Sequence, residues 1–121
     1  MTGHIEAIAF DAQDAEALAA FWCAALGYQV TDRWRDAHGL EYVEATREGA
    51  TMLLFQPVPE GKAAKNRVHL DVRPAGTQRE EVDRLVALGA RVLSDSADLP
   101  WIAMADPEGN EFCVLGTPEL R

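Results

Sequence analysis

The sequence is poor in basic residues and has no long apolar run. Its 11 Lys and Arg residues are outnumbered by 20 Asp and Glu residues, which gives a formal net charge of −9. An acidic surface repels phosphate backbones and anionic lipids, so we expect no nucleic acid and no membrane as a partner. No apolar stretch approaches the roughly 20 residues of a membrane span. The first residues lack the basic and apolar regions of a signal peptide, so we expect a cytoplasmic protein.

Cysteine is scarce as well. Cys23 and Cys113 are the only two, and neither stands in a C-x-x-C pair. The pattern therefore gives no support for a disulfide framework or a zinc knuckle. Two reduced thiols in a cytoplasmic protein are the simplest interpretation. The chain of 121 residues has room for one globular domain and not for two.

Hydrophobic periodicity in the first half of the chain predicts one strand, one helix and then three strands. Asp14 is placed to cap the helix, which we expect over 15–26 with Gly27 as its C-cap. A tight turn at Glu48-Gly49 separates the last two strands. The four predicted strands cover residues 4–11, 28–35, 40–47 and 50–58.

The same order repeats after a charged linker at 60–65. The first strand, 66–73, alternates strictly: Val68, Leu70 and Val72 point one way, and His69, Asp71 and Arg73 point the other. A capping box of Thr77 and Glu80 begins a helix that ends at Gly89. The apolar stripe of this helix consists of Val82, Leu85, Val86 and Leu88. The remaining predicted strands cover 91–94, 101–105 and 111–116.

The two halves can be superimposed as a repeat. Leu26-Gly27 matches Leu88-Gly89 at an offset of 62, and the turn glycines Gly49 and Gly109 match at an offset of 60. A half of this size buries too little core to be stable alone, so we expect the two to pack as one unit. The prediction is an α+β fold: one domain over 1–121, made of βαβββ modules at 1–58 and 66–121.

Two motifs carry a resemblance to a known family. Asp14…Phe21-Trp22…Leu26-Gly27 matches a D…F-Y…L-G helix signature, and 106–110 reads Asp-Pro-Glu-Gly-Asn, a D-P-D/E-G-N turn. The chain resembles the vicinal oxygen chelate superfamily, which includes glyoxalase I, bleomycin-resistance proteins, fosfomycin-resistance enzymes and extradiol dioxygenases. It is most similar to the short glyoxalase-like domain proteins of this group. The resemblance implies a cupped mixed sheet with helices outside, a site on the concave face, and a homodimer.

The resemblance also implies where a divalent metal would bind. The ligand positions of the family fall on Ala7, Leu53, His69 and Cys113. Ala and Leu cannot bind a metal, and one imidazole with one thiol is too few ligands. We therefore expect no metal cofactor. A rearranged set of His69, Asp71, Glu111 and Cys113 is the alternative.

Two classes of function follow from this site. The first is a metal-free protein that binds a small organic molecule in a cleft, like the bleomycin-resistance proteins, which sequester a drug. The second is an enzyme, a lyase or oxidoreductase that uses a divalent metal or His69 as a general base. Cys113 as a nucleophile, with His69 as its base, competes with a small thiol that packs in the core. His69 and Asp71 could also serve only to hydrogen-bond neighbouring strands. The expected ligand-binding residues are Ala7, Leu53, Phe55, His69, Asp71, Trp101 and Cys113.

Overall fold

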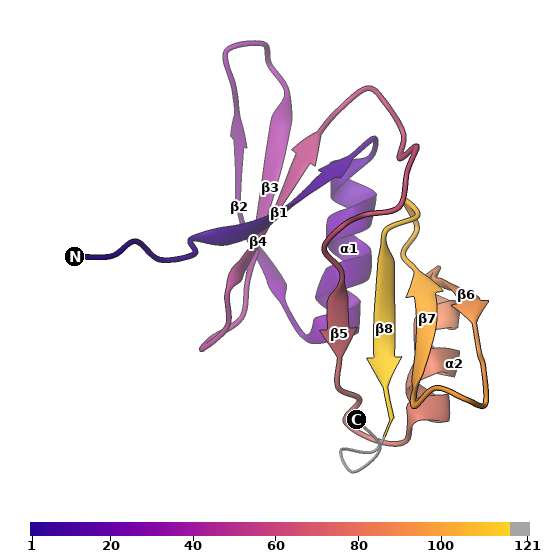
Figure 1. The fold of residues 1–121 in the computed structure, drawn as a ribbon. Helices are drawn as coiled ribbons and strands as arrows, with labels where there is room; N and C mark the ends of the chain where they lie inside the picture. The colour runs from indigo at the N-terminus through magenta and orange to yellow at the C-terminus, as the bar shows by residue number, and fades with distance from the viewer. Residues whose placement is uncertain (117–121) are drawn as a thin grey trace. The chain divides into compact units, whose positions relative to one another are not determined.

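Each half of the chain folds into a four-stranded mixed sheet with one helix (Figure 1). The structure is a computed structural model that describes residues 1–116. The order of elements is βαβββ in both halves, which confirms the predicted α+β fold. By contacts, the chain divides into two compact units, Met1–Gly61 and Lys62–Arg121, so the boundary falls within the charged linker at 60–65. The last five residues of the predicted second module, 117–121, lie outside the described residues.

The first unit has the strand order β1-β4-β3-β2, in which β1 and β4 are parallel and the other neighbours are antiparallel. Its helix, α1, lies against this sheet and contacts all four strands. The elements are β1 (Ala7–Ala12), α1 (Ala15–Leu26), β2 (Gln29–Arg35), β3 (Glu41–Thr46) and β4 (Met52–Pro57).

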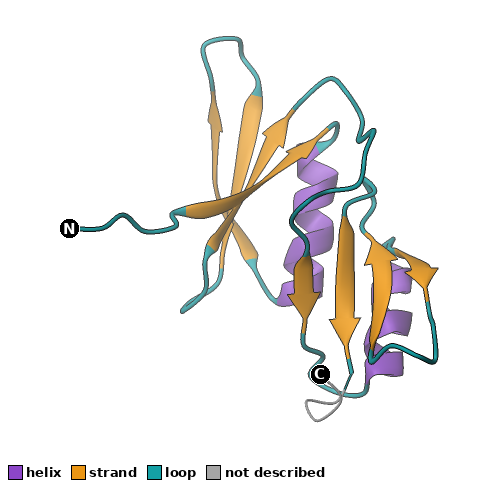
Figure 2. Cartoon of the chain, viewed as in Figure 1, coloured by secondary structure: helices purple, strands orange, loops and turns teal. Residues whose placement is uncertain are grey.

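The second unit repeats this arrangement with the order β5-β8-β7-β6, again with one parallel pair, β5 and β8. Its helix, α2, contacts β6 and β8 and lies along one face of the sheet (Figure 2). The elements are β5 (Leu70–Val72), α2 (Gln78–Leu88), β6 (Arg91–Ser94), β7 (Trp101–Ala105) and β8 (Glu111–Leu115).

Both helices begin and end where the sequence predicts. The Asp14 carboxylate accepts a hydrogen bond from the backbone N–H of Ala17 at 3.0 Å, and Gly27 ends α1 with a φ of 71°. Thr77 and Glu80 form a complete capping box at the start of α2. These side chains satisfy backbone N–H groups that a helix terminus leaves without partners.

The packing of the helices is partly as predicted. In α1, Phe21 is buried beside Trp22, with ring centroids 5.1 Å apart, whereas Leu26 is only half-buried. In α2, Val82 and Leu85 are buried, but Val86 and Leu88 are exposed. The prediction of a four-residue stripe on α2 was therefore wrong. The helix meets its sheet along a narrower line, formed by an i, i+3 pair.

The predicted strand at 66–73 is much shorter in the structure, where β5 covers only Leu70–Val72. The partner strand β8 begins at Glu111, and its next residue, Phe112, pairs with Leu70. Residues before 69 therefore run past the start of β8, the strand with which β5 pairs. Val68 is 80% exposed, so its expected place on the apolar face was wrong.

Candidate functional site

The sheet of the second unit has one face covered by α2 and one open face. The residues on the covered face are buried, and Val72, Phe112 and Val114 are among them. The open face holds the alternate positions, where Asp71 pairs with Cys113 and Cys113 pairs with Ala103. Side chains of paired residues project from the same face of a sheet. Three neighbouring strands thus place Asp71, Cys113 and Ala103 side by side on the open face.

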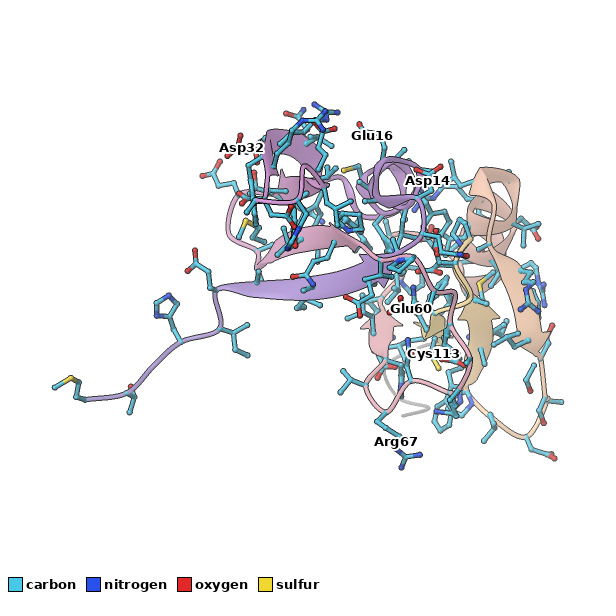
Figure 3. All side chains as sticks on the ribbon, turned by 90° about the horizontal axis from the view of Figure 1, so that it is seen from above. Asp14, Glu16, Asp32, Glu60, Arg67 and Cys113 are labelled. Atoms are coloured by element: carbon cyan, nitrogen blue, oxygen red, sulfur yellow. The ribbon has the colours of Figure 1, made fainter. Side chains whose placement is uncertain are left out.

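Three of the predicted site residues gather on this face. The Nε2 atom of His69 lies 3.2 Å from Oδ1 of Asp71, and their side chains are 43% and 38% exposed. Sγ of Cys113 joins them: one donor atom from each of the three residues lies within 4.8 Å of the others. Cys113 is labelled in Figure 3, on β8. His69 comes just before β5, so a short parallel strand pair builds the whole cluster.

Cys113 is held in its protonated form. Partial burial raises the pKa of its thiol, and the negative charge of Asp71 raises the pKa further, while Lys65 acts weakly in the opposite direction. A thiol is a poor nucleophile, because the thiolate is the reactive species. The electrostatics of the cluster therefore oppose the interpretation of Cys113 as a nucleophile at neutral pH.

Glu111 lies on the same strand, but its carboxylate is already engaged. One oxygen lies 2.7 Å from Nζ of Lys62, and the other accepts a hydrogen bond from the backbone N–H of Asn66 at 3.1 Å. The hydrogen bond from Lys62 is the main cause that lowers the pKa of Glu111 to about 2, and the bond from Asn66 contributes. Glu111 thus ties the segment that precedes β5 to the start of β8. It is absent from the cluster of His69, Asp71 and Cys113.

The Asp-Pro-Glu-Gly-Asn motif is a structural turn. Asp106 is buried and accepts hydrogen bonds from the backbone N–H groups of Glu108 and Asn110 and from the side-chain amide of Asn110, each at 2.9 Å. Gly109 adopts a φ of 92°, a region that glycine enters without strain. Asn110 also accepts from the side chain of Asn66 at 2.8 Å. The motif therefore sets the start of β8 and, through Asn66, the approach to His69.

Sequence reasoning missed the contribution of Lys62 and Asn66. Their partner Glu111 lies more than 40 residues away in the chain. No local spacing could have identified these contacts, because they exist only once the linker folds back over β8. They position the cluster and do not form part of it.

Trp101 also lies on the open face of this sheet. It pairs with Leu115, which is two residues from Cys113 on β8, and it is partly exposed. A polar hollow of about 370 Å³ lies beside the 106–110 turn, where Lys62, Arg91, Glu108 and Glu111 contribute to its lining. None of His69, Asp71, Trp101 and Cys113 lines this hollow.

Two expected ligand-binding residues of the first unit lie in the core. Leu53 and Phe55 are 2% and 0% exposed, and Phe55 stacks on Phe10, which in turn contacts Trp22 of α1. Their placement in a cleft was wrong. Ala7 lies on the opposite face of the sheet, because it pairs with Met52 and not with Leu53.

The error comes from the glycine alignment of the two β-turns. Five residues separate the strands in both halves, but Gly49 is the third of its five and Gly109 is the fourth. The strand register gives the correct offset for the last strands. Ala9 and Asp71 are equivalent at the offset of 62, and they pair with Leu54 and Cys113, so β4 and β8 are related by an offset of 59. A shift of one residue moves a strand side chain to the other face. The first-unit counterpart of Cys113 is therefore Leu54.

The corrected positions of the implied metal site are Ala7, Leu54, His69 and Cys113. Ala7 and Leu54 offer no donor atom, and Asp71 is the third donor beside His69 and Cys113. Mg²⁺ and Ca²⁺ bind through oxygen ligands, and of these three residues Asp71 alone supplies one. Zinc accepts three protein ligands and a water, but its donors lie about 3.3–3.8 Å apart. Donor atoms spread over as much as 4.8 Å would have to move closer to share one ion.

The comparisons with known proteins agree with this architecture. A family model described as a glyoxalase-like domain matches residues 7–115. The chain therefore belongs to the glyoxalase-like domain family, within the vicinal oxygen chelate superfamily. Among curated proteins, no sequence matches the chain significantly.

Solved structures with the same fold have low sequence identity. A mutant of the fosfomycin resistance protein FosX from Listeria monocytogenes, complexed with Mn(II) and a dihydroxypropylphosphonic acid, aligns with a TM-score of 0.77 at 15% identity, covering 98% of this chain and 97% of that one. The glyoxalase I of Leishmania major aligns with a TM-score of 0.74 at 13% identity, and the alignment covers 95% of this chain and 87% of that one. A glyoxalase-related enzyme from Fulvimarina pelagi aligns with a TM-score of 0.69 at 20% identity, and the alignment covers 97% of this chain and 90% of that one. These similarities establish the fold alone.

Membrane insertion by a helix has no basis in the described part of the chain. Its two helices have 12 and 11 residues. Neither has the length and apolar character of a membrane span.

Proposed function

We propose that this protein binds a small organic molecule on the open face of the sheet formed by β5–β8, without a resident metal. The observation that carries the proposal is the exposed pair of His69 and Asp71, 3.2 Å apart, beside the protonated thiol of Cys113. Ligand sites typically combine a few convergent polar groups with an apolar lining. Here His69 and Asp71 are the polar groups, and Trp101 and Ala103 on β7 extend the apolar surface. Sequestration of a ligand, as in the bleomycin-resistance proteins that this chain resembles, requires no more than such a site.

The absence of donor atoms at Ala7 and Leu54 supports the metal-free form of this proposal. Half of the implied ligand set is apolar, and Nε2 of His69 lies 3.2 Å from a carboxylate oxygen of Asp71, a residue outside that set. A His–Asp pair that is complete in itself can accept and donate hydrogen bonds to a ligand directly.

The experiment is a ligand-observed NMR screen of small organic fragments against the protein and two variants. Asp71→Asn removes the charge and keeps the shape, and His69→Ala removes the imidazole. We expect fragments that bind the parent to bind His69→Ala at least about tenfold more weakly. The variant should lose little stability, because the side chain of His69 is exposed. His38→Ala, in the exposed turn between β2 and β3, is the matched control. Hits that bind His69→Ala as tightly as the parent would contradict the assignment.

A second candidate function is an enzyme in which His69 is the general base. The observation that favours it is again the contact of Nε2 with Asp71, because a carboxylate there holds the proton on Nε2 and leaves Nδ1 as the basic nitrogen. Proton abstraction next to a carbonyl group needs such a base. Deuterium exchange into the methyl group of pyruvate, followed by NMR, provides the test. Catalysed exchange that is lost in His69→Ala would favour the enzyme over the simple binder.

A further inference from the structure

The sheet of the first unit also has one face packed on its helix and one open face. Val43, Leu53 and Phe55 are buried on the packed face. The alternate positions form the open face, and register places one row across four strands: Asp32 pairs with Glu44, Glu44 with Leu54, and Leu54 with Ala9. The row therefore runs from two carboxylates to an apolar side chain and a methyl group.

An aromatic stack stands next to the two carboxylates. Trp34 and Tyr42 are cross-strand partners two residues further along β2 and β3, on the same face, with ring centroids 4.1 Å apart and planes inclined by 7°. Both rings are fixed at their polar ends: Trp34 donates from Nε1 to Glu44 at 2.7 Å, and Tyr42 donates to Asp36 at 3.1 Å. β2 is an edge strand and Trp34 is 39% exposed, so ring surface of the stack remains open to solvent.

The two carboxylates lie on directly paired residues, and neither forms a salt bridge with a Lys or Arg among residues 1–116. Like charges directly opposite on neighbouring strands destabilise a sheet. Arg33 cannot neutralise them, because it projects from the other face and binds Glu16 of α1. The hydrogen bonds of Asp32 and Glu44 come from neutral groups, the backbone N–H of Arg33 and the indole of Trp34. Asp32 is labelled in Figure 3, on the first unit.

No Lys or Arg occupies the open-face positions that the register defines on the four strands of this sheet. These positions are Ala7, Ala9, Asp11, Gln29, Asp32, Trp34, Tyr42, Glu44, Thr46, Met52, Leu54 and Gln56. Aromatic and apolar surface beside uncompensated negative charge is complementary to a ligand with an apolar body and a positive charge.

We propose that the open face of the sheet formed by β1–β4 binds a planar organic cation, which stacks on Trp34 and places its positive charge beside Asp32 and Glu44. A cation above an aromatic face gains a further electrostatic attraction. The ligand also relieves the repulsion between the two opposed carboxylates. This site is built wholly from the first unit, so it does not rest on the function proposed for His69 and Asp71.

The test is calorimetric titration with three probes of the same ring size: N-methylquinolinium, neutral quinoline at about pH 8, and the anion quinaldate. We expect the cation to bind at least about tenfold more tightly than quinoline, with an affinity that falls as salt rises, and quinaldate to bind more weakly than either. Glu44→Gln keeps an acceptor for the indole of Trp34 and removes the charge. This variant should bind N-methylquinolinium about threefold more weakly than the parent, and the double variant with Asp32→Asn about tenfold more weakly. The affinity of both variants for quinoline should be unchanged.

Glu48→Gln is the matched control, since it removes one charge from the exposed β3–β4 turn of the same unit. It should leave the affinity for N-methylquinolinium within about twofold of the parent. Trp34→Leu should bind both N-methylquinolinium and quinoline more weakly than the parent, because both rings stack on the indole of Trp34. The proposal is overturned if N-methylquinolinium shows no saturable binding, if quinoline binds as tightly, or if the double variant binds the cation like the parent.

Discussion

The contact between Lys62 and Glu111 yields a quantitative prediction about stability. Both side chains are 20% exposed, and the two charged atoms lie 2.7 Å apart. The pKa of Glu111 is lowered from 4.5 to about 2. At about 1.36 kcal/mol for each pKa unit, this change corresponds to about 3.4 kcal/mol as an upper limit. Solvent screening of a partly exposed pair reduces the figure, so we expect Glu111→Gln to cost about 2 kcal/mol at neutral pH.

The dependence on pH follows from the direction of the pKa change. The pKa of Glu111 is lower in the folded protein than in the unfolded chain, so its charge stabilises the fold above about pH 4.5. This contribution is lost as the pH falls from about 4.5 to about 2, because the carboxyl of the unfolded chain is protonated near 4.5 and that of the folded protein only near 2. The difference in unfolding free energy between the parent and Glu111→Gln should therefore shrink towards zero over this range.

Urea denaturation of the parent and the variant at a series of pH values measures this difference. Glu60→Gln, which changes an exposed carboxylate in the linker after β4, is the control and should change the free energy of unfolding by less than about 0.5 kcal/mol at every pH. A difference for Glu111→Gln that is equally small at neutral pH, or that stays constant down to about pH 2.5, would refute the stabilising role of this contact.

Three further predictions concern the core, the thiol and the assembly. Phe21→Ala should lower the free energy of unfolding by roughly 3–5 kcal/mol, because Phe21 is buried between α1 and its sheet; an unchanged urea midpoint would contradict that packing. Alkylation of Cys113 by iodoacetamide at about pH 8 should be slower in the native protein than in urea, since burial and the charge of Asp71 raise the pKa of the thiol; in a Cys23→Ala background, equal rates would contradict a protonated thiol. Light scattering should give the mass of a homodimer, as the resemblance implies, and a monomer mass at micromolar concentration would contradict it.

The sequence predicted the order of elements, the helix caps and one face of the second sheet. Caps depend on local chemistry, and Asp14 and the Thr77–Glu80 box act within one turn of the chain. His69, Asp71 and Cys113 could be predicted to meet because strict alternation fixes the side from which a strand residue projects. The helix signature and the turn motif then indicated which strands are neighbours.

What could not be predicted depended on register and on long-range contacts. The two turns place their glycine at positions that differ by one residue, so aligning the glycines shifted β4 by one residue relative to β8. This shift determines whether Leu53 or Leu54 is assigned to the open face. The short length of β5 was decided by where β8 begins. The stacking of Trp34 on Tyr42, and the opposition of Asp32 and Glu44, required the pairing of β2 with β3 across a bulge between Val30 and Asp32.

The most direct test of the proposed function is to measure binding and metal content on the same sample. Protein treated with a chelator and shown by elemental analysis to hold less than about 0.05 metal ions per chain is titrated with the best fragment found for the parent, alongside His69→Ala. We predict that the metal-depleted parent binds the fragment as tightly as untreated protein and that His69→Ala binds it at least about tenfold more weakly. Loss of binding on metal removal, with recovery when zinc is added back, would contradict a metal-free site at His69, Asp71 and Cys113.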